Sequence, residues 1–252
     1  MKESLNDSGL KVFVISLTDS KSRREKVTRQ LDAKKIKFEF LNAIDGRTSN
    51  HPYLKNYNES QFLINRRRKA ALGELGCYVS HLLAWEKCVA LNEPIVVLED
   101  DFELTDNFAE GLKFVANFAD RVPFIRLEPL ESKMFLTSYH GEEFSLVKQL
   151  RIAMCATGYM ITPQGAGAFL KNGREIRYPI DLYLKYTFIH KQPMYALTPN
   201  IVYPTHANSV IGMTIRQHRE KGVVLQIKRF IFKWLYVVGN TVTTLKNVYS
   251  TF

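Results

Sequence analysis

A run of β-branched and aromatic residues, Lys11-Val-Phe-Val-Ile-Ser-Leu17, stands directly before a polar turn, Thr18-Asp-Ser-Lys-Ser22. The run predicts a buried strand, and the turn has the residue types that begin a helix. Val27 and Leu31 lie one helical turn apart, so a helix is expected over residues 20–34. A strand that follows this helix would complete a β-α-β unit, the start of an open α/β sheet. Such sheets bind ligands outside the carboxyl ends of their strands.

The alternation of strand and helix signals continues along the chain. Strands are expected over 38–41, 95–98, 123–127 and 152–161, with an edge strand over 194–197. Helices are expected over 70–91, from an N-cap at Asp106 through Phe118, and between Pro163 and Gly173. The residues from Arg47 to Lys69 have no clear period and predict a long surface loop. The predicted fold class is therefore α/β.

Composition excludes several classes of protein. The 252 residues are 46% hydrophobic and 24% charged, as in an ordinary globular protein and unlike a collagenous or disordered chain. No apolar run approaches the ~20 residues of a bilayer span, and Met1–Asp7 lacks the apolar core of a signal peptide. We therefore expect a soluble or peripheral protein that is not secreted. The three cysteines Cys77, Cys88 and Cys155 have no CxxC spacing, which predicts buried free thiols in a reducing compartment.

The formal net charge of +10 favours anionic partners, and it is concentrated near the C-terminus. Residues 215–252 contain seven basic residues and one acidic residue. On a helical wheel, Lys228, Arg229, Lys233 and Gln226 form one polar stripe, and apolar or aromatic side chains occupy the remainder. This pattern is typical of a helix in a membrane interface. It is equally consistent with a helix whose apolar side packs on the domain, and one helix can do both.

Three consecutive carboxylates, Glu99-Asp100-Asp101, follow the strand expected over 95–98. Like charges at such close range repel and raise one another's pKa unless a cation or hydrogen-bond donors compensate. Hard oxygen ligands at a strand's carboxyl end suit Mg²⁺ or Mn²⁺ bound together with a diphosphate. The alternative is a solvated acidic turn that precedes a helix cap.

Four motifs along the first hundred residues resemble those of glycosyltransferase family 25, the bacterial lipopolysaccharide or lipooligosaccharide transferases, which are mostly galactosyltransferases. They are Val12-Phe-Val-Ile-Ser-Leu17 with Ser22-Arg-Arg24, Ala43-Ile-Asp-Gly46, Gly73-Glu-Leu-Gly-Cys-Tyr-Val-Ser-His81 and Val97-Leu-Glu-Asp-Asp101. Weaker likeness continues through Gly158-Tyr-Met-Ile161, Gly165-Ala166 and Pro179-Ile-Asp181.

The resemblance implies a GT-A fold with a Rossmann-like nucleotide-binding half. It also implies a nucleotide-sugar donor, usually a UDP-sugar, and a transfer that depends on Mn²⁺ (or Mg²⁺) and inverts the anomeric centre. In this picture Asp101 binds the metal, and Glu99 and Asp100 contact the ribose or the sugar hydroxyls. His206 is the candidate for a second metal ligand, with a plain loop histidine as the alternative.

The same resemblance places six further residues on the donor side: Ser16, Leu17, Arg24, Asp45, Ser80 and His81. Each has an ordinary alternative, such as a solvated helix charge for Arg24 or an Asp-Gly turn for Asp45. Ser80 and His81 are 100° apart on the expected helix, so they should not both point into the core. His81 is expected beneath the donor site, unless it is simply a satisfied helix histidine.

Inverting transfer needs a general base for the acceptor hydroxyl, and a carboxylate is the usual choice. Asp181 matches the family's Pro-x-Asp position and is the expected base, with acceptor binding or helix capping as alternatives; Glu128 is the reserve candidate. Sugar-stacking aromatics could come from Tyr139, Tyr178, Tyr183 and Tyr186. The basic run 66–69 could contact an anionic acceptor or form a solvated face.

The expected organisation is a GT-A-like catalytic domain over 1–216, with a nucleotide-sugar-binding half (10–103) and an acceptor half (104–216), and a basic amphipathic helical segment over 217–252. The expected function is transfer of galactose from UDP-galactose to a lipid-linked lipooligosaccharide or lipopolysaccharide core. The protein would work in the cytoplasm, on the inner face of the bacterial inner membrane, held to anionic lipid by the C-terminal helix. The alternatives are a catalytically silent relative that binds nucleotide sugar and a nucleic-acid-binding protein. Nucleic acid is not an expected partner, because the acidic triplet would repel a phosphate backbone.

Overall fold

The computed structural model describes residues 8–132, 134–205 and 222–249. The chain begins with β1 (Lys11–Ser16), α1 (Lys21–Ala33) and β2 (Phe38–Asn42). Strand β1 pairs in parallel with β2 on one side and with β3 (Ile95–Glu99) on the other. The predicted β-α-β unit is therefore present. Its two strands, β1 and β2, and the neighbouring strand β3 have their carboxyl ends on the same side of the sheet.

The main sheet has eight strands in the order β2-β1-β3-β8-β5-β9-β7-β6. The strands beyond β3 are β8 (Gly158–Ile161), β5 (Phe124–Arg126), β9 (Tyr195–Thr198), β7 (Ser145–Gln149) and β6 (Phe135–His140). Strand β8 runs antiparallel to both of its neighbours, so the sheet is mixed. A small second sheet pairs β4 (Phe102–Leu104) with β10 (Val202–Pro204).

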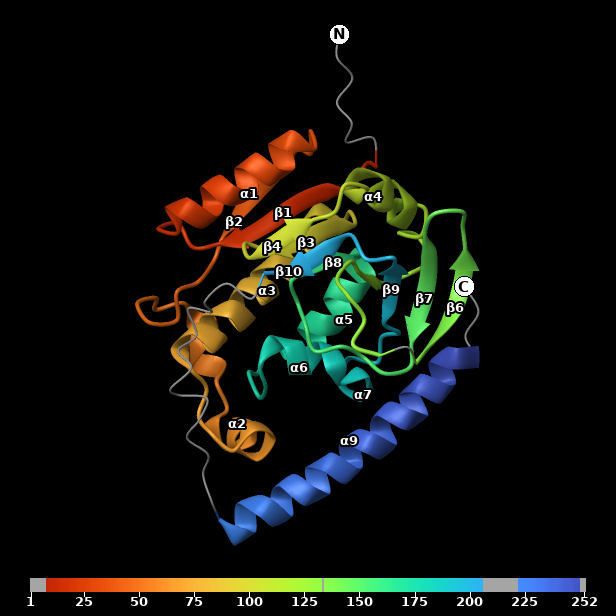
Figure 1. Cartoon of the computed structure of the whole chain (residues 1–252). Coiled ribbons are helices and arrows are strands. Elements are labelled where there is room, and N and C mark those ends of the chain that lie inside the picture. The colour runs from red at the N-terminus through yellow and green to blue at the C-terminus, as the bar shows by residue number, and fades with distance from the viewer. Residues whose placement is uncertain (1–7, 133, 206–221, 250–252) are drawn as a thin grey trace.

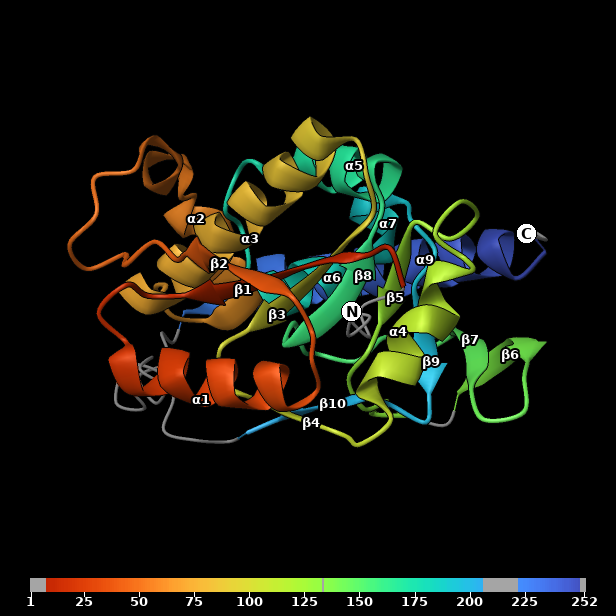
Figure 2. The ribbon, with the colours of Figure 1, turned by 90° about the horizontal axis from the view of Figure 1, so that it is seen from above.

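Helices cover both faces of the main sheet. They are η1 (Pro52–Asn56), α2 (Glu59–Arg66), α3 (Leu72–Leu91), α4 (Phe108–Ala116), α5 (Pro163–Gly173), α6 (Ile180–Lys185), α7 (Thr187–His190) and α9 (Val223–Tyr249). Alternate residues of β1 divide between two cores: Phe13 and Ile15 pack with α3 and α5, whereas Val12 and Val14 pack with α1 and α4. Figure 2 shows these two helix pairs on opposite sides of the sheet. This layered arrangement confirms the predicted α/β class.

The C-terminal helix α9 runs along the outside of the molecule (Figure 1). One face packs on the domain through Phe232 and Tyr236. Arg229 Nη1 donates to the Ile64 and Asn65 carbonyl oxygens, and Asn240 Oδ1 accepts from Thr187 and Phe188. One face of the helix therefore packs on the domain, but most of its apolar side does not: Phe230, Trp234 and Leu235 are 58–61% exposed. Among the described residues, no helix is both long and apolar enough to cross a membrane.

Several sequence expectations were wrong in detail. The segment from Arg47 to Lys69 is no continuous loop, because it contains η1 and α2. The helix expected to begin at Asp106 has Asn107 as its N-cap, and it ends at Ala116, before Phe118. Of the strand expected over 152–161, only β8 forms. Strand β9 is interior, because the β6–β7 hairpin, which was not predicted, extends the sheet beyond it.

Candidate active site

A pocket of about 160 Å³ lies at the carboxyl ends of β1 and β3, against the first half of α3. Seven of the residues singled out in the sequence line it: Ser16, Leu17, Asp45, Ser80, Glu99, Asp100 and Asp101. Residues separated by as many as 85 positions are thus brought to one site by the parallel pairing of β1 with β3. This is the position at which open α/β sheets bind their ligands.

Asp100, in the lining of the pocket, is fixed by two donors. The Ser16 hydroxyl donates to Asp100 Oδ2 over 2.6 Å, and Arg23 Nη1 lies 2.8 Å from Asp100 Oδ1. The Asp100 side chain is 11% exposed, so the ion pair is partly sheltered from water. Both oxygens of this carboxylate are therefore occupied by groups of the protein itself.

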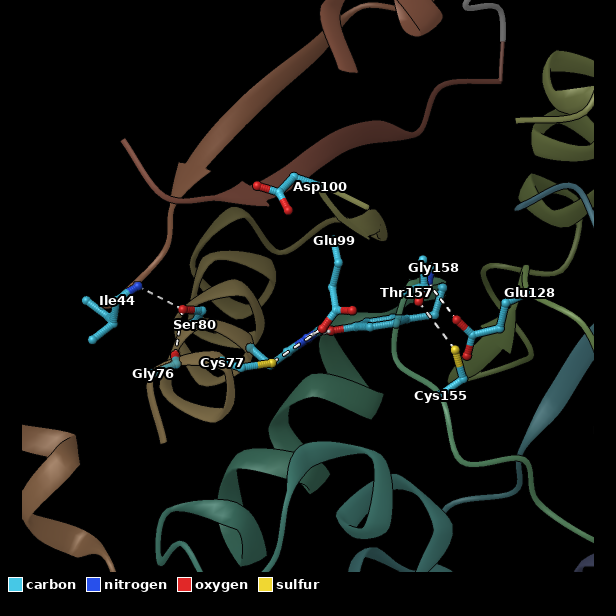
Figure 3. Close-up of polar contacts among 12 residues, drawn as sticks. Ile44, Gly76, Cys77, Ser80, Glu99, Asp100, Glu128, Cys155, Thr157 and Gly158 are labelled. Carbon is cyan, nitrogen blue, oxygen red and sulfur yellow. Dashed lines mark hydrogen bonds and ion pairs between the residues drawn. The ribbon is translucent and has the colours of Figure 1, made fainter. Parts of the chain in front are cut away.

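Glu99 points the other way, toward α3, as Figure 3 shows. Its Oε1 lies 3.2 Å from His81 Nε2 and accepts from Cys77 Sγ over 3.3 Å. Trp85 Nε1 donates to the Tyr159 hydroxyl, so that hydroxyl has its proton available for His81 Nδ1, 2.8 Å away. The proton of a neutral His81 then sits on Nε2 and faces Glu99. Burial would raise the pKa of Glu99, but the hydrogen bonds from His81 and Cys77 hold it below its usual value.

The side chains of Cys77, His81 and Glu99 are also close enough to share a metal ion, because their potential ligand atoms lie within 4.8 Å of one another. Burial raises the pKa of Cys77 well above its usual value, and the Glu99 charge adds to the effect. Without a metal, the protonated thiol donates a hydrogen bond to Glu99; a bound metal would instead take the sulfur as a thiolate. The cluster holds Glu99 in place beneath the pocket.

Asp101 differs from its two neighbours. Its Oδ1 is buried and has no hydrogen-bond partner among the described residues. Burial, followed by the charge of Glu99, raises its pKa to about 7. An unpaired, buried carboxylate oxygen beside two other carboxylates is the environment that a hard divalent cation would compensate. The donor set therefore fits Mg²⁺ or Mn²⁺, with Asp101 as the available ligand.

The second predicted metal ligand, His206, lies outside the described residues. The preceding residue, Thr205, is described: its backbone N–H and its hydroxyl both donate to the Asp101 carbonyl oxygen, at 2.7 and 2.8 Å. The strand pairing of β10 with β4 leads the chain to this point. Thr205, the residue before this predicted ligand, is therefore in contact with the backbone of Asp101.

Arg24 does not line the pocket. Its guanidinium donates to the Leu17 and Ser16 carbonyl oxygens and to Asn42 Oδ1, at 3.0, 2.9 and 2.7 Å. Arg23 lines the pocket in its place and pairs with Asp100. Sequence reasoning missed Arg23 because adjacent helical residues point 100° apart, and the motif alone does not give the rotation of α1.

The segment 43–46 is held against α3. The Ser80 hydroxyl donates to the Gly76 carbonyl oxygen and accepts from the Ile44 N–H (Figure 3). A Cβ on Gly46 would lie 2.0 Å from the Leu72 carbonyl oxygen, so only glycine permits this approach. Ser80 and His81 are both buried, contrary to expectation, because α3 is covered by segment 43–46 on one side and by the sheet on another.

Asp45 lines the pocket and is paired with Arg47. Its Oδ1 accepts from the Arg47 backbone N–H and Nε, and its Oδ2 accepts from Arg47 Nη2, at 3.0, 2.8 and 2.9 Å. These hydrogen bonds lower the pKa of Asp45. The pairing keeps Asp45 ionised in the lining of the pocket, which also includes Arg23 and Ser16.

The two candidate bases occupy different environments. Asp181 lies in the first turn of α6, outside the pocket lining; burial raises its pKa, and the charge of Glu99 acts on it as well. Glu128 is fully buried in an ion pair with Arg126 and accepts from the Gly158 N–H over 2.8 Å (Figure 3). The Glu128 carboxylate is thus engaged inside the core, which makes it unsuitable as a base for an external hydroxyl.

Several of the residues predicted to contact the acceptor are buried. Tyr178, Tyr183 and Tyr186 are buried in an aromatic cluster, so they stabilise the core, and only Tyr139 is exposed. In the basic run 66–69, Arg68 is 5% exposed and forms an ion pair with Glu74. These residues were identified by type alone, and residue type does not distinguish a buried from an exposed position.

Residues 10–184 match the family described as glycosyltransferase family 25 (LPS biosynthesis protein). The match covers more than half of the 252 residues, and the chain belongs to this family. The resemblance inferred from the four motifs is therefore confirmed.

Three relatives illustrate the family. The glycosyltransferase 25 family member of Aedes aegypti is 28% identical over 224 residues, covering 77% of this chain and 36% of the relative. The lipooligosaccharide biosynthesis protein lex-1 of Haemophilus influenzae is 28% identical over 202 residues, covering 65% of this chain and 63% of the relative. The Homo sapiens procollagen galactosyltransferase 2 is 24% identical, covering 77% and 35%. The chain thus spans about a third of two of these relatives and 63% of the other.

Proposed function

We propose that this glycosyltransferase transfers a hexose to a lipooligosaccharide or lipopolysaccharide core acceptor and inverts the configuration at the anomeric carbon. The proposed donor is UDP-galactose. The observation that carries the proposal is a buried carboxylate oxygen in the pocket at the carboxyl ends of β1 and β3: Asp101 Oδ1 has no hydrogen-bond partner among the described residues. The names of the Haemophilus and human relatives support the acceptor class and the galactose donor, respectively.

The donor would lie along the pocket in the nucleotide-sugar-binding half, residues 10–103. Ser16, Leu17 and Asp45 would contact the nucleoside, and Arg23 carries the positive charge at the position proposed for the phosphates. Glu99, held by His81, and Asp100, held by Ser16, would offer fixed oxygens to sugar or ribose hydroxyls. Side chains that are already fixed before the donor arrives lose little entropy on binding.

Asp101 would hold the divalent cation, with His206 as a second ligand. The bound cation would supply the positive charge that stabilises the nucleoside diphosphate as it leaves. Asp181 would accept the proton of the acceptor hydroxyl while that oxygen bonds to the anomeric carbon and the bond to the diphosphate breaks on the opposite face. Its raised pKa makes it a stronger base than an ordinary carboxylate.

The helix α9 would place the acceptor half, residues 104–216, beside the cytoplasmic face of the membrane. Ile227, Ile231, Trp234, Val238, Val242 and Leu245 recur at three- and four-residue intervals along it, and each is 46–58% exposed. This stripe, together with the basic residues of segment 217–252, is the composition of an interfacial helix. Unchanged partitioning onto anionic vesicles after removal of residues 217–252 would contradict the anchoring role.

The test of the donor is a panel of nucleotide sugars incubated with the purified protein and Mn²⁺, with and without EDTA. The expected result is metal-dependent binding and slow hydrolysis of one UDP-sugar. If the folded protein binds a UDP-sugar but never turns it over, even with lipooligosaccharide acceptors, the catalytically silent alternative would be correct. Absence of binding to every donor would refute the proposal.

A further inference from the structure

A second pocket, of about 380 Å³, lies between α2, α6 and α9, away from the acidic triplet. Four cationic side chains contribute to its lining: Arg151, Lys185, Arg229 and Lys233. None of the described residues that line it is acidic. A concave site with concentrated positive charge attracts an anion, because the low-dielectric walls focus the field.

One lining residue, Asn65, has a buried acceptor without a partner among the described residues. Asn65 is 7% exposed, and its amide nitrogen donates to the Gln61 and Arg177 carbonyl oxygens. Its Oδ1 is buried and has no partner among the described residues. An unpaired buried acceptor costs stability until a donor reaches it, and an anion has no proton to offer. The ligand should therefore present a hydroxyl as well as a negative charge.

Aromatic rings complete the lining. Tyr186, Phe232 and Tyr236 form one cluster, with Tyr186 ring centroids 5.7 Å from Phe232 and 4.8 Å from Tyr236. These rings give the pocket an apolar wall, as ligand pockets commonly have. Phe232, Lys233 and Tyr236 lie on α9, the helix that also carries the exposed apolar stripe from Ile227 to Leu245. Phe232 and Tyr236 pack on the domain, so the pocket and the exposed stripe lie on different faces of the same helix.

We propose that this pocket binds the phosphorylated sugar headgroup of a membrane glycolipid, with its phosphate on the cationic side chains and a hydroxyl on Asn65. The proposal rests on the proposed function, since it names the part of the lipid-linked acceptor that the enzyme would hold. It adds a recognition site whose lining shares no residue with that of the donor pocket. The site would select lipids by headgroup, whereas the stripe on α9 would bind any apolar phase.

The test uses the full chain and vesicles of phosphatidylcholine that contain either phosphatidylinositol 4-phosphate or phosphatidylserine, at matched surface potential. The first lipid has a hydroxylated ring with a phosphate, and the second has neither a ring nor a phosphomonoester. Wild type should prefer the first by roughly tenfold, the effect of one or two charge-assisted hydrogen bonds. The double variant Lys185→Gln/Lys233→Gln should lose this preference.

The matched control is Lys228→Gln/Lys246→Gln, which removes the same charge from exposed positions of α9 outside the pocket. It should weaken binding to both vesicle types equally and keep the preference. Loss of preference in both variants, or in neither, would overturn the site. Competition by submillimolar glucose 6-phosphate would overturn the lipid source, because it would show that a soluble sugar phosphate suffices. UDP-sugar binding, measured on the same samples without vesicles, separates failure of this site from failure of the donor proposal.

Discussion

The Ser16 hydroxyl and the Asp100 carboxylate are 84 residues apart in sequence and 2.6 Å apart in space. This hydrogen bond joins the end of β1 to the turn after β3, and Arg23 occupies the other oxygen of Asp100. Glu99 is tied to His81 in the opposite direction. Of the three consecutive carboxylates, only Asp101 has a buried oxygen without a partner among the described residues. Two carboxylates of the triplet are therefore held by other side chains, and the third, Asp101, is available to bind a cation.

Asp101→Asn should abolish metal-dependent donor hydrolysis, with a loss of at least about a hundredfold, because an amide oxygen cannot neutralise the cation. The same variant should be more stable than wild type at pH 8 without metal. The native pKa of Asp101 is raised to about 7, so its stabilising contribution is present at low pH and is lost as the pH rises through that value. Thermal melts should show a gain of a few degrees.

The control for this variant is the effect of added Mn²⁺ on the melting temperature. Mn²⁺ should stabilise wild type and leave Asp101→Asn unchanged, since ligands stabilise only the state that binds them. Undiminished Mn²⁺-dependent turnover in the variant would remove Asp101 from the metal site.

Arg23 and Arg24 form a natural pair for separating binding from stability. Arg23→Gln should raise the KM for the UDP-sugar by roughly tenfold, because it removes a charge from the pocket. Arg24→Gln should instead lower the free energy of unfolding by about 1–3 kcal/mol, since it removes hydrogen bonds to Ser16, Leu17 and Asn42. Steady-state kinetics and urea unfolding on both variants distinguish the two roles. The reverse pattern would show that the motif residue Arg24 is the ligand contact.

Asp181→Asn and Glu128→Gln test the assignment of the base. Asp181→Asn should reduce transfer to acceptor by about 10²–10⁴-fold and leave donor binding intact. Glu128→Gln should unfold more readily, by about 3–5 kcal/mol, because it leaves the fully buried Arg126 guanidinium without its charge partner. A normally folded Glu128→Gln with abolished transfer, beside an active Asp181→Asn, would exchange the two roles.

The central strands and the donor-side motifs were predictable because their signals are local. The β-branched runs at 11–17 and 95–98 specify buried strands, and the triplet follows directly from the second one. The choice of Arg23 over Arg24 and the pairing of Cys77 with Glu99 were not predictable. Both depend on the rotation of a helix about its axis, which is fixed by packing against the sheet.

The second half of the chain was harder to predict for a different reason. The hairpin of β6 and β7 has the burial pattern of a sheet margin, with β6 mostly exposed, so it lacks a continuous apolar run. Tyr183 packs against Tyr78, far away in the sequence, and Arg68 pairs with Glu74 on the following helix. Side-chain type suggested sugar stacking and anion binding at these positions, whereas long-range packing determined where they lie.

Stability should decrease as the pH falls from 6.5 toward 4, in part because of His190. This side chain is 1% exposed, and burial lowers its pKa to about 4. Its Nδ1 accepts from the Gln192 N–H, and its Nε2 contacts the Leu184 carbonyl oxygen, so the neutral ring satisfies both bonds. The pKa of this histidine in the unfolded chain is about 6.5, so below that pH the unfolded chain binds a proton that the native state does not bind. This difference lowers the free energy of unfolding by about 2 kcal/mol at pH 5.

His190→Gln should remove that part of the slope in urea unfolding measured between pH 7 and pH 5. Above pH 7 the variant and wild type should have parallel profiles, which serves as an internal control. Identical slopes below pH 6.5 would mean that His190 is protonated in the native state.

Trp234 and Phe232 are aromatic residues on α9, two positions apart, with opposite environments. Trp234 is 58% exposed, whereas Phe232 packs against the rings of Tyr178 and Tyr186. Trp234→Ser should therefore reduce vesicle binding severalfold and leave the urea midpoint nearly unchanged, because an interfacial tryptophan contributes only when lipid is present. Phe232→Ser should lower the midpoint, since it opens a space in the packed face of the helix. Equal vesicle binding by wild type and Trp234→Ser would mean that the exposed stripe of α9 meets a surface other than lipid.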